Sequence, residues 1–164
     1  GTWLALTAAR LGQADALWAG LGTHAVPADR FDKAVADLAS GGDADTVLAS
    51  HSSAPTGEPT LPALQPVIDR CFAGDTVEAI LAALDAETGE HADWAAKQAA
   101  AIRSKSPTSL KIALRQMQVG EASDFNESMR IEYRIVSRIE KGVDFYEGVR
   151  AVIIDKDNFA EFLP

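Results

Sequence analysis

The residues best suited to chemistry lie near the C-terminus, in the stretch DFYEGVRAVIIDKD at residues 144–157. Asp144 and Glu147 stand three residues apart among aromatic side chains, and Arg150 and Lys156 follow them. The two cations could bind an anionic group such as a phosphate. The Asp-x-x-Glu spacing is also that of a capping box at the start of a helix. The stretch therefore admits a ligand contact, a structural role, or both.

The rest of the sequence shows no catalytic or metal-binding motif. Its three histidines, at positions 24, 51 and 91, are far apart and lack a second ligand at metal-binding spacing. No nucleophile elbow or phosphate-binding glycine pattern occurs. Cys71 stands between Ile68 and Phe72, which predicts a small core residue rather than a nucleophile. We therefore expect neither a metal ion nor a resident cofactor.

Composition narrows the class of protein. The chain has 164 residues, 47% of them hydrophobic, which is enough to bury a core. The net charge of −9 argues against non-specific binding to nucleic acid or to anionic membranes. A single cysteine and the lack of a long apolar run predict a cytoplasmic protein without membrane spans. Because the chain starts at Gly1 and turns apolar at once, in WLALTAARL, we expect a fragment of a longer protein.

Helical patterns account for most of the chain. Apolar residues at 31, 35 and 38 predict a helix that Ser40-Gly41-Gly42 ends, and Ser106-Pro107 predicts the start of another. Asp75, Asp124 and Asp144 each precede a Glu by three residues, so each is a predicted N-cap. Four prolines make residues 52–66 a predicted loop between residues 1–51 and a helical domain at 67–164. We predict an all-α chain with at most one or two short strands, one of them at residues 23–26.

The predicted helix from Phe125 to Lys141 combines a wide apolar arc with a basic edge. We expect this helix to be mostly buried. Glu132 falls in the middle of the apolar arc, where a carboxylate without a partner would be costly. Arg150 lies in another apolar segment and is the first choice of partner, with Arg115 second. The sequence thus predicts a structural ion pair between Glu132 and Arg150.

Several blocks resemble one enzyme family. SPTSLKIALRQ (106–116), EYR (132–134) and DFYEGVRAVIIDKD (144–157) are similar to the C-terminal third of 3-hydroxyisobutyryl-CoA hydrolases, a branch of the enoyl-CoA hydratase/isomerase (crotonase) superfamily. GTWLALTAARLGQADALWAGLGTHAVP resembles the family segment that follows the active-site glycine loop. The resemblance covers nearly the whole chain, with residues 40–100 the least characteristic. Ala8 stands where many members have Gly, and NFAEF replaces a Pro and Trp pattern near the end.

The resemblance implies a role for the longer protein, the hydrolysis of 3-hydroxyisobutyryl-CoA to the acid and CoA in valine breakdown. Its oxyanion hole and catalytic acids would lie upstream of Gly1, so no catalytic residue is carried onto this chain. The end of a crotonase contributes to the acyl-CoA pocket. Lys156 is therefore the candidate contact for CoA, Arg150 the second candidate, and Phe145 and Val152 candidate lining of an acyl pocket.

Two alternatives stay open at this point. The longer protein could be an enoyl-CoA hydratase/isomerase, because the acids that separate hydration from hydrolysis are not in this chain. The chain could instead be a non-catalytic helical module that forms homo-oligomers through exposed apolar surface. Under every alternative except the last, acyl-CoA is the expected small-molecule partner, and we expect a homo-oligomer.

Overall fold

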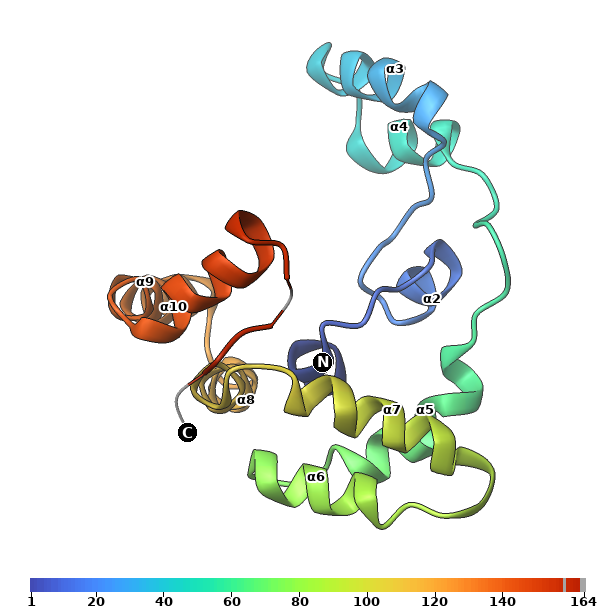
Figure 1. Cartoon of the computed structure of the whole chain (residues 1–164). Coiled ribbons are helices and arrows are strands. Elements are labelled where there is room, and N and C mark those ends of the chain that lie inside the picture. The colour runs from blue at the N-terminus through green and yellow to red at the C-terminus, as the bar shows by residue number, and fades with distance from the viewer. Residues whose placement is uncertain (158, 163–164) are drawn as a thin grey trace. The chain divides into compact units, whose positions relative to one another are not determined.

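The computed structural model describes residues 1–157 and 159–162, and every regular element in them is helical (Figure 1). The predicted all-α class is therefore confirmed for this part of the chain. Residues 23–26, the expected strand, are irregular because no second strand is present among the described residues to pair with them. Within the same residues, every helix is too short or insufficiently apolar to cross a lipid bilayer.

The chain forms two compact units, which we call the small unit (10–66) and the large unit (1–9 and 67–164). The boundary after residue 66 coincides with the expected start of the helical domain. Residues 1–9, which we had grouped with residues 10–51, instead pack in the large unit, where α1 (Thr2–Thr7) contacts α7 and α8.

The small unit holds α2 (Gln13–Trp18), α3 (Ala28–Ala39) and α4 (Ala44–His51). The packing of α3 against α4 buries Ala34, Val47 and His51. The imidazole Nε2 of His51 lies 2.8 Å from Asp37 Oδ2, so the buried ring has a polar partner. The core of this unit is small, and Phe31 and Val35 of α3 remain 59% and 48% exposed.

The predicted loop at 52–66 is shorter than expected, because α5 (Leu61–Cys71) begins inside it. The Asp15 carboxylate accepts hydrogen bonds from the backbone N–H groups of Thr60 and Leu61, at 2.7 and 2.8 Å. Pro62 fits in the first turn, where its missing N–H would have no helical partner. Pro66 lies inside the helix, a position that the proline pattern argued against.

The core of the large unit is built by α1, α6 (Val77–Asp85), α7 (Ala92–Arg103) and α8 (Pro107–Gly120), with the 3₁₀ turn η1 (Gly89–His91) before α7. Its fully buried side chains include Leu6, Val67, Cys71, Ile80, Leu84 and Ile102. Cys71 is thus a core residue as predicted, and burial raises the pKa of its thiol.

Two of the predicted caps are confirmed and two are wrong. Ser106 caps α8, and Asp124 caps α9 (Phe125–Ile139) through a 2.8 Å bond from the N–H of Glu127. Thr76, not Asp75, caps α6, by accepting from the N–H of Ala79. Asp144 lies inside α10 (Val143–Val149), and its carboxylate accepts from the Ser106 hydroxyl instead of capping.

Helix α9 is less buried than we expected. No residue of α9 is fully buried, and Phe125 and Tyr133 are 77% and 76% exposed. The inner isoleucines at 131, 135 and 139 are half-buried and line hollows shared with α8. The sequence pattern is amphipathic as predicted, but the described residues cover only one part of its apolar arc.

Candidate functional site

Arg150 makes many of the polar contacts near the C-terminal end of the described chain. It begins the π-helical turn η2 (Arg150–Ile154), in which the N–H of Asp155 donates to the Arg150 carbonyl at 2.8 Å. This wider turn follows α10 directly and brings the carboxylate of Asp155 back to the arginine. π-Helical turns occur frequently at functional sites, so the side chains around this one are described in full.

The Arg150 guanidinium binds three carboxylates and one carbonyl. Nε and Nη2 donate to the two Glu147 oxygens at 2.9 and 2.7 Å, and Nη1 donates to Asp155 and Asp157 at 2.6 and 2.9 Å. The second Nη2 hydrogen reaches the carbonyl of Phe159 at 2.7 Å. These contacts use all five guanidinium N–H groups. We call Glu147, Arg150, Asp155 and Asp157 the Arg150 cluster.

Hydrogen bonds in the Arg150 cluster shift the pKa values of Glu147, Asp157 and Arg150. Hydrogen bonding from Arg150, with a further bond from the N–H of Glu161, lowers the pKa of Glu147 from 4.5 to about 2. The N–H of Phe159 is the main cause of the lowered pKa of Asp157, and Arg150 adds to it. The carboxylates, Glu147 foremost, raise the pKa of Arg150. Glu147, Asp157 and Arg150 are therefore charged at neutral pH.

These contacts contradict the expected ion pair between Arg150 and Glu132. Its partner is Glu147, with Asp155 and Asp157, and not Glu132, because the π-helical turn and the following residues bring nearer acids to it. All its N–H groups are used within the described residues, and its role as the second candidate contact for CoA stays a prediction. Arg150 connects Asp155, Asp157 and Phe159 to α10.

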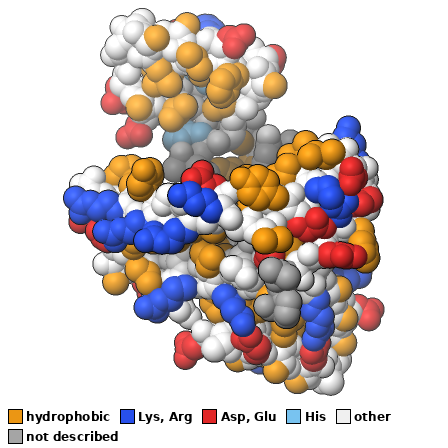
Figure 2. All heavy atoms as spheres, turned by 60° about the vertical axis from the view of Figure 1, so that its left-hand side comes forward, with side chains coloured by type: hydrophobic (Ala, Val, Ile, Leu, Met, Phe, Trp, Pro, Cys, Tyr) orange, Lys and Arg blue, Asp and Glu red, His pale blue; other side chains and the backbone are white. Residues whose placement is uncertain are grey.

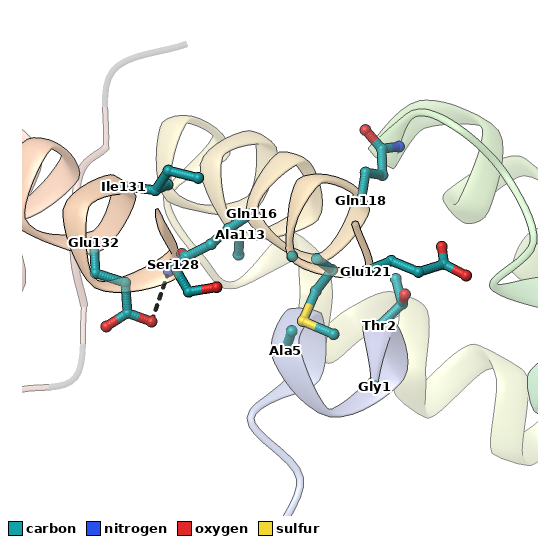
Figure 3. Close-up of a pocket in the computed structure, with 12 residues that line it drawn as sticks. Gly1, Thr2, Ala5, Ala113, Gln116, Gln118, Glu121, Ser128, Ile131 and Glu132 are labelled. Atoms are coloured by element: carbon teal, nitrogen blue, oxygen red, sulfur yellow. Dashed lines mark hydrogen bonds between the residues drawn. The ribbon is translucent and has the colours of Figure 1, made fainter. Parts of the chain in front are cut away.

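Glu132 does not need a buried partner, because it lies on the exposed part of α9. Its Oε1 accepts a 3.1 Å hydrogen bond from the side-chain amide of Gln116, drawn as a dashed line in Figure 3. Arg115 was the second predicted partner, but its Nη1 lies 3.5 Å from Oε1 of Gln118. The prediction of a Glu132 ion pair assumed that the middle of the apolar arc is covered, whereas Glu132 is exposed in the part of the chain that the structure describes.

Glu132 lines a hollow of the large unit with a volume of about 710 Å³. Its walls come from the start of α1, the second half of α8 and the start of α9 (Figure 3). Figure 3 shows the side chains of Thr2, Gln118 and Glu121 at one end of this hollow, and Ser128 and Glu132 at the other. The lining side chains of this hollow include amides, hydroxyls and carboxylates, and no Lys, Arg or His is among them to meet an anionic ligand.

Phe145 and Val152, the predicted acyl-pocket residues, line one hollow of about 440 Å³. Val149, Ile153 and Phe162 contribute further apolar wall, so α10, η2 and the end of the described chain all take part. We call this the Phe145 hollow. The structure thus brings both candidates to one apolar surface, and their contact with an acyl chain stays a prediction.

One end of the Phe145 hollow is polar, which we did not predict. Lys105, Ser106, Ser109 and Asp144 lie there, and the Ser106 hydroxyl donates to Asp144 Oδ2. Sequence reasoning treated Ser106 and Asp144 only as helix caps. Two features of the sequence could have suggested this contact, the polar run KSPTS at 105–109 and the aromatic pair at 145–146, whose rings need a surface to pack on. Small-ligand sites combine apolar walls with a few polar groups in this way.

Lys156 is exposed and does not line the Phe145 hollow. Its backbone has a φ of 56°, in the left-handed region that a residue with a side chain rarely adopts. Among the described residues its ammonium has no hydrogen-bonded or ion-paired partner, while both neighbouring aspartates bind Arg150. Lys156 is therefore free to meet a ligand, and its role in binding CoA stays a prediction. No group of three metal-ligating side chains occurs in the part of the chain that the structure describes.

Comparison of the chain with known proteins identifies its family. The family model for enoyl-CoA hydratase/isomerase matches residues 1–164, so the chain belongs to this family. The expectation drawn from residues 106–116 and 144–157 is thereby confirmed.

Individual relatives carry two kinds of name. The 3-hydroxyisobutyryl-CoA hydrolase 1 of Arabidopsis thaliana is 38% identical over the whole chain, which covers 46% of that protein. The mitochondrial 3-hydroxyisobutyryl-CoA hydrolase of Xenopus laevis is 37% identical, with 100% of this chain and 44% of that one covered. An enoyl-CoA hydratase structure from Rhodobacter sphaeroides is 37% identical with a TM-score of 0.80, covering 99% of this chain and 46% of that one. The chain thus spans somewhat less than half the length of these relatives.

Proposed function

We propose that this chain is the C-terminal helical part of an acyl-CoA thioesterase that hydrolyses 3-hydroxyisobutyryl-CoA to 3-hydroxyisobutyrate and CoA. The observation that carries the proposal is the 38% identity, along the whole chain, to a protein named for this reaction. Water adds its oxygen to the thioester carbonyl, the C–S bond breaks, and the sulfur takes the proton. The reaction needs no resident cofactor, and we propose none.

In this proposal the chemistry lies in the half of the longer protein that precedes Gly1. We expect this chain to be inactive by itself. The contribution of this chain is a surface for the substrate, with the apolar wall of the Phe145 hollow for the acyl group. Lys156 would meet a CoA phosphate, and Arg150 would hold the segment that carries it.

Enoyl-CoA hydration is the second candidate, favoured by the likeness to the Rhodobacter sphaeroides enoyl-CoA hydratase structure. The two reactions differ in active-site acids that lie outside this chain, so its own residues suit both. Placement in valine breakdown follows from the hydrolase proposal alone. The cytoplasmic location also stays a prediction, since the Xenopus laevis relative is named mitochondrial.

The test measures thiol release from 3-hydroxyisobutyryl-CoA by this chain and by a chain extended upstream to the length of its relatives. We expect turnover by the long chain and none by the short one. Turnover by the short chain would overturn the placement of the chemistry. If the long chain hydrates crotonyl-CoA and releases no thiol, the hydratase proposal replaces the hydrolase.

A further inference from the structure

The polar end of the Phe145 hollow is built from two helices. Lys105 and Ser106 directly precede α8, Ser109 lies in its first turn, and Asp144 belongs to α10. On the face that Figure 2 turns forward, orange hydrophobic side chains lie beside red acidic and blue basic ones in several places. The Phe145 hollow differs from such a mixed surface because it is concave, and its volume of about 440 Å³ is that of a small-ligand site.

Ser106 holds the Asp144 carboxylate at this end of the hollow. Ser106 is only 5% exposed, its hydroxyl donates to Asp144 Oδ2, and its Oγ accepts from the N–H of Ser109 at 3.0 Å. The single hydroxyl proton of Ser106 is therefore used. A carboxylate can accept about four hydrogen bonds, so Asp144 can accept one from a ligand and keep the one from Ser106.

Ser109 and Lys105 supply hydrogen-bond donors at the same end. Both side chains are exposed. Within the part of the chain that the structure describes, neither the Ser109 hydroxyl nor the Lys105 ammonium has a hydrogen-bonded or ion-paired partner. Both groups can therefore donate to a ligand that enters the hollow.

This combination of acceptor and donors favours one kind of polar group. A phosphate or a carboxylate would meet the Asp144 carboxylate, and an ammonium would meet Lys105. A hydroxyl suits both sides, because it donates one hydrogen bond and accepts others. The remaining wall of the hollow is apolar, so the matching ligand is a small apolar group that carries a hydroxyl.

We propose that the polar end of the Phe145 hollow binds the 3-hydroxyl of the acyl group. The hydroxyl donates to Asp144 and accepts from Ser109 or Lys105. This inference rests on the proposed function, which places the acyl group on the apolar wall of the same hollow. These three residues would then distinguish 3-hydroxyisobutyryl-CoA from isobutyryl-CoA, which lacks only the hydroxyl.

The test compares thiol release from these two esters by the chain extended upstream to the length of its relatives. The measured quantity is the hydroxyl selectivity, the kcat/KM for 3-hydroxyisobutyryl-CoA divided by that for isobutyryl-CoA. We expect a value of about ten or more, because a hydrogen bond to a charged group is lost with the hydroxyl. The exposed donors regain water when the hydroxyl is absent, which keeps the selectivity moderate.

Three variants remove the recognising groups one at a time. Asp144→Asn should lower the hydroxyl selectivity about fivefold, because a neutral amide oxygen accepts more weakly than a carboxylate. Ser109→Ala and Lys105→Met should each lower it about two- to threefold, since either donor can replace the other. The last two variants change exposed side chains, so they keep the test decisive if Asp144→Asn, which alters the contact with Ser106, does not fold.

Ser104→Ala is the matched control for Ser109→Ala. Ser104 is an exposed serine of the same segment, but its hydroxyl donates to the carbonyl of Ala101 and it does not line the hollow. The hydroxyl selectivity of this variant should equal that of the wild type. A fall as large as that of Ser109→Ala would overturn the inference.

The same kinetics separate this inference from the proposed function. If the variants lower kcat/KM equally for both esters, the polar end meets the CoA arm or supports the fold, and the inference is wrong. If the wild type releases thiol from both esters with equal kcat/KM, the inference fails while the proposed thioesterase stands. Thiol release from neither ester would overturn the proposed function and this inference with it.

Discussion

The Glu147 carboxylate joins three separate parts of the C-terminal segment. Its Oε1 accepts from Arg150 Nη2 at 2.7 Å and from the N–H of Glu161 at 2.9 Å, while its Oε2 accepts from Arg150 Nε at 2.9 Å. One residue of α10 thus holds both the first residue of the π-helical turn and a backbone group 14 residues on. The stretch around Arg150 is dense in charge because it fastens the end of the described chain to α10.

The first prediction concerns pH. The pKa of Glu147 falls from 4.5 in the unfolded chain to about 2 in the cluster, so its charged form favours the folded segment. That stabilisation is complete above pH 4.5 and is lost as pH falls towards 2. We expect amide exchange at Glu161, corrected for its intrinsic pH dependence, to lose protection over this window. Glu147→Gln should already show reduced protection at pH 6, and a wild-type chain with full protection at pH 2.5 would contradict the assignment.

The second prediction concerns the fork of Arg150. Lysine has three donors on one nitrogen and cannot reach Glu147, Asp157 and the Phe159 carbonyl together. Arg150→Lys should therefore release residues 155–161, which limited proteolysis would detect as faster cleavage there. Arg103→Lys is a matched control, because Arg103 forms a two-bond pair with Asp85 and no contact with this segment. Equal cleavage of both variants would show that Arg150 does not hold the segment.

The third prediction concerns Ala8, the residue that stands where many family members have Gly. Ala8 ends α1 with φ 54° and ψ 34°, a left-handed conformation that costs a residue with a Cβ about 1–2 kcal/mol. Gly at this position would avoid that cost, but Gly also loses more conformational freedom on folding. Ala8→Gly should therefore raise the free energy of unfolding by about 0.5–1 kcal/mol. Ala5→Gly, inside the same helix, should lower it by about the same amount. Urea denaturation of both variants checks the opposite signs.

The start of α6 shows how far local sequence can predict. The capping pattern located the helix correctly but chose Asp75, because Asp-x-x-Glu has the expected spacing. The structure uses Thr76, whose extended backbone lets its hydroxyl accept from the N–H of Ala79 at 3.1 Å. Patterns of this kind locate the start of a helix to within a residue or two. The N-cap is the last residue with an extended backbone before the helix, which the pattern does not specify.

The fourth prediction follows from that correction. Thr76→Ala should destabilise the chain by about 0.5–2 kcal/mol, because the N–H of Ala79 loses its acceptor. Asp75→Ala should change the free energy of unfolding much less, since Gln118 binds the backbone carbonyl of Asp75 and not its carboxylate. Thermal melts of the two variants give the comparison. A larger effect at Asp75 would return the cap to the residue chosen from the sequence.

The candidate site was predictable where local pattern and resemblance sufficed. Phe145 and Val152 do share a hollow, because Phe145 of α10 and Val152 of the η2 turn that follows are about two helical turns apart. Glu147 precedes Arg150 by three residues, which is the spacing of a helical ion pair, so this partner was open to prediction from the sequence. Asp155 was not, since the π-helical turn brings it back to Arg150. The polar end of the hollow depends on Ser106 meeting Asp144, 38 positions away, which no helical period encodes.

The last prediction tests Lys156 in the chain extended to the length of its relatives. Lys156→Glu keeps a long side chain at the left-handed position and reverses only the charge. An exposed ion pair is worth about 0.2–1 kcal/mol, so loss of a phosphate contact should raise KM for acyl-CoA about two- to fivefold, with little change in kcat. Lys141→Glu is the matched control, because Lys141 is exposed at the end of α9 and lines none of these hollows. If both variants raise KM equally, the effect belongs to overall charge. If neither variant raises KM, Lys156 does not contact a phosphate of the substrate.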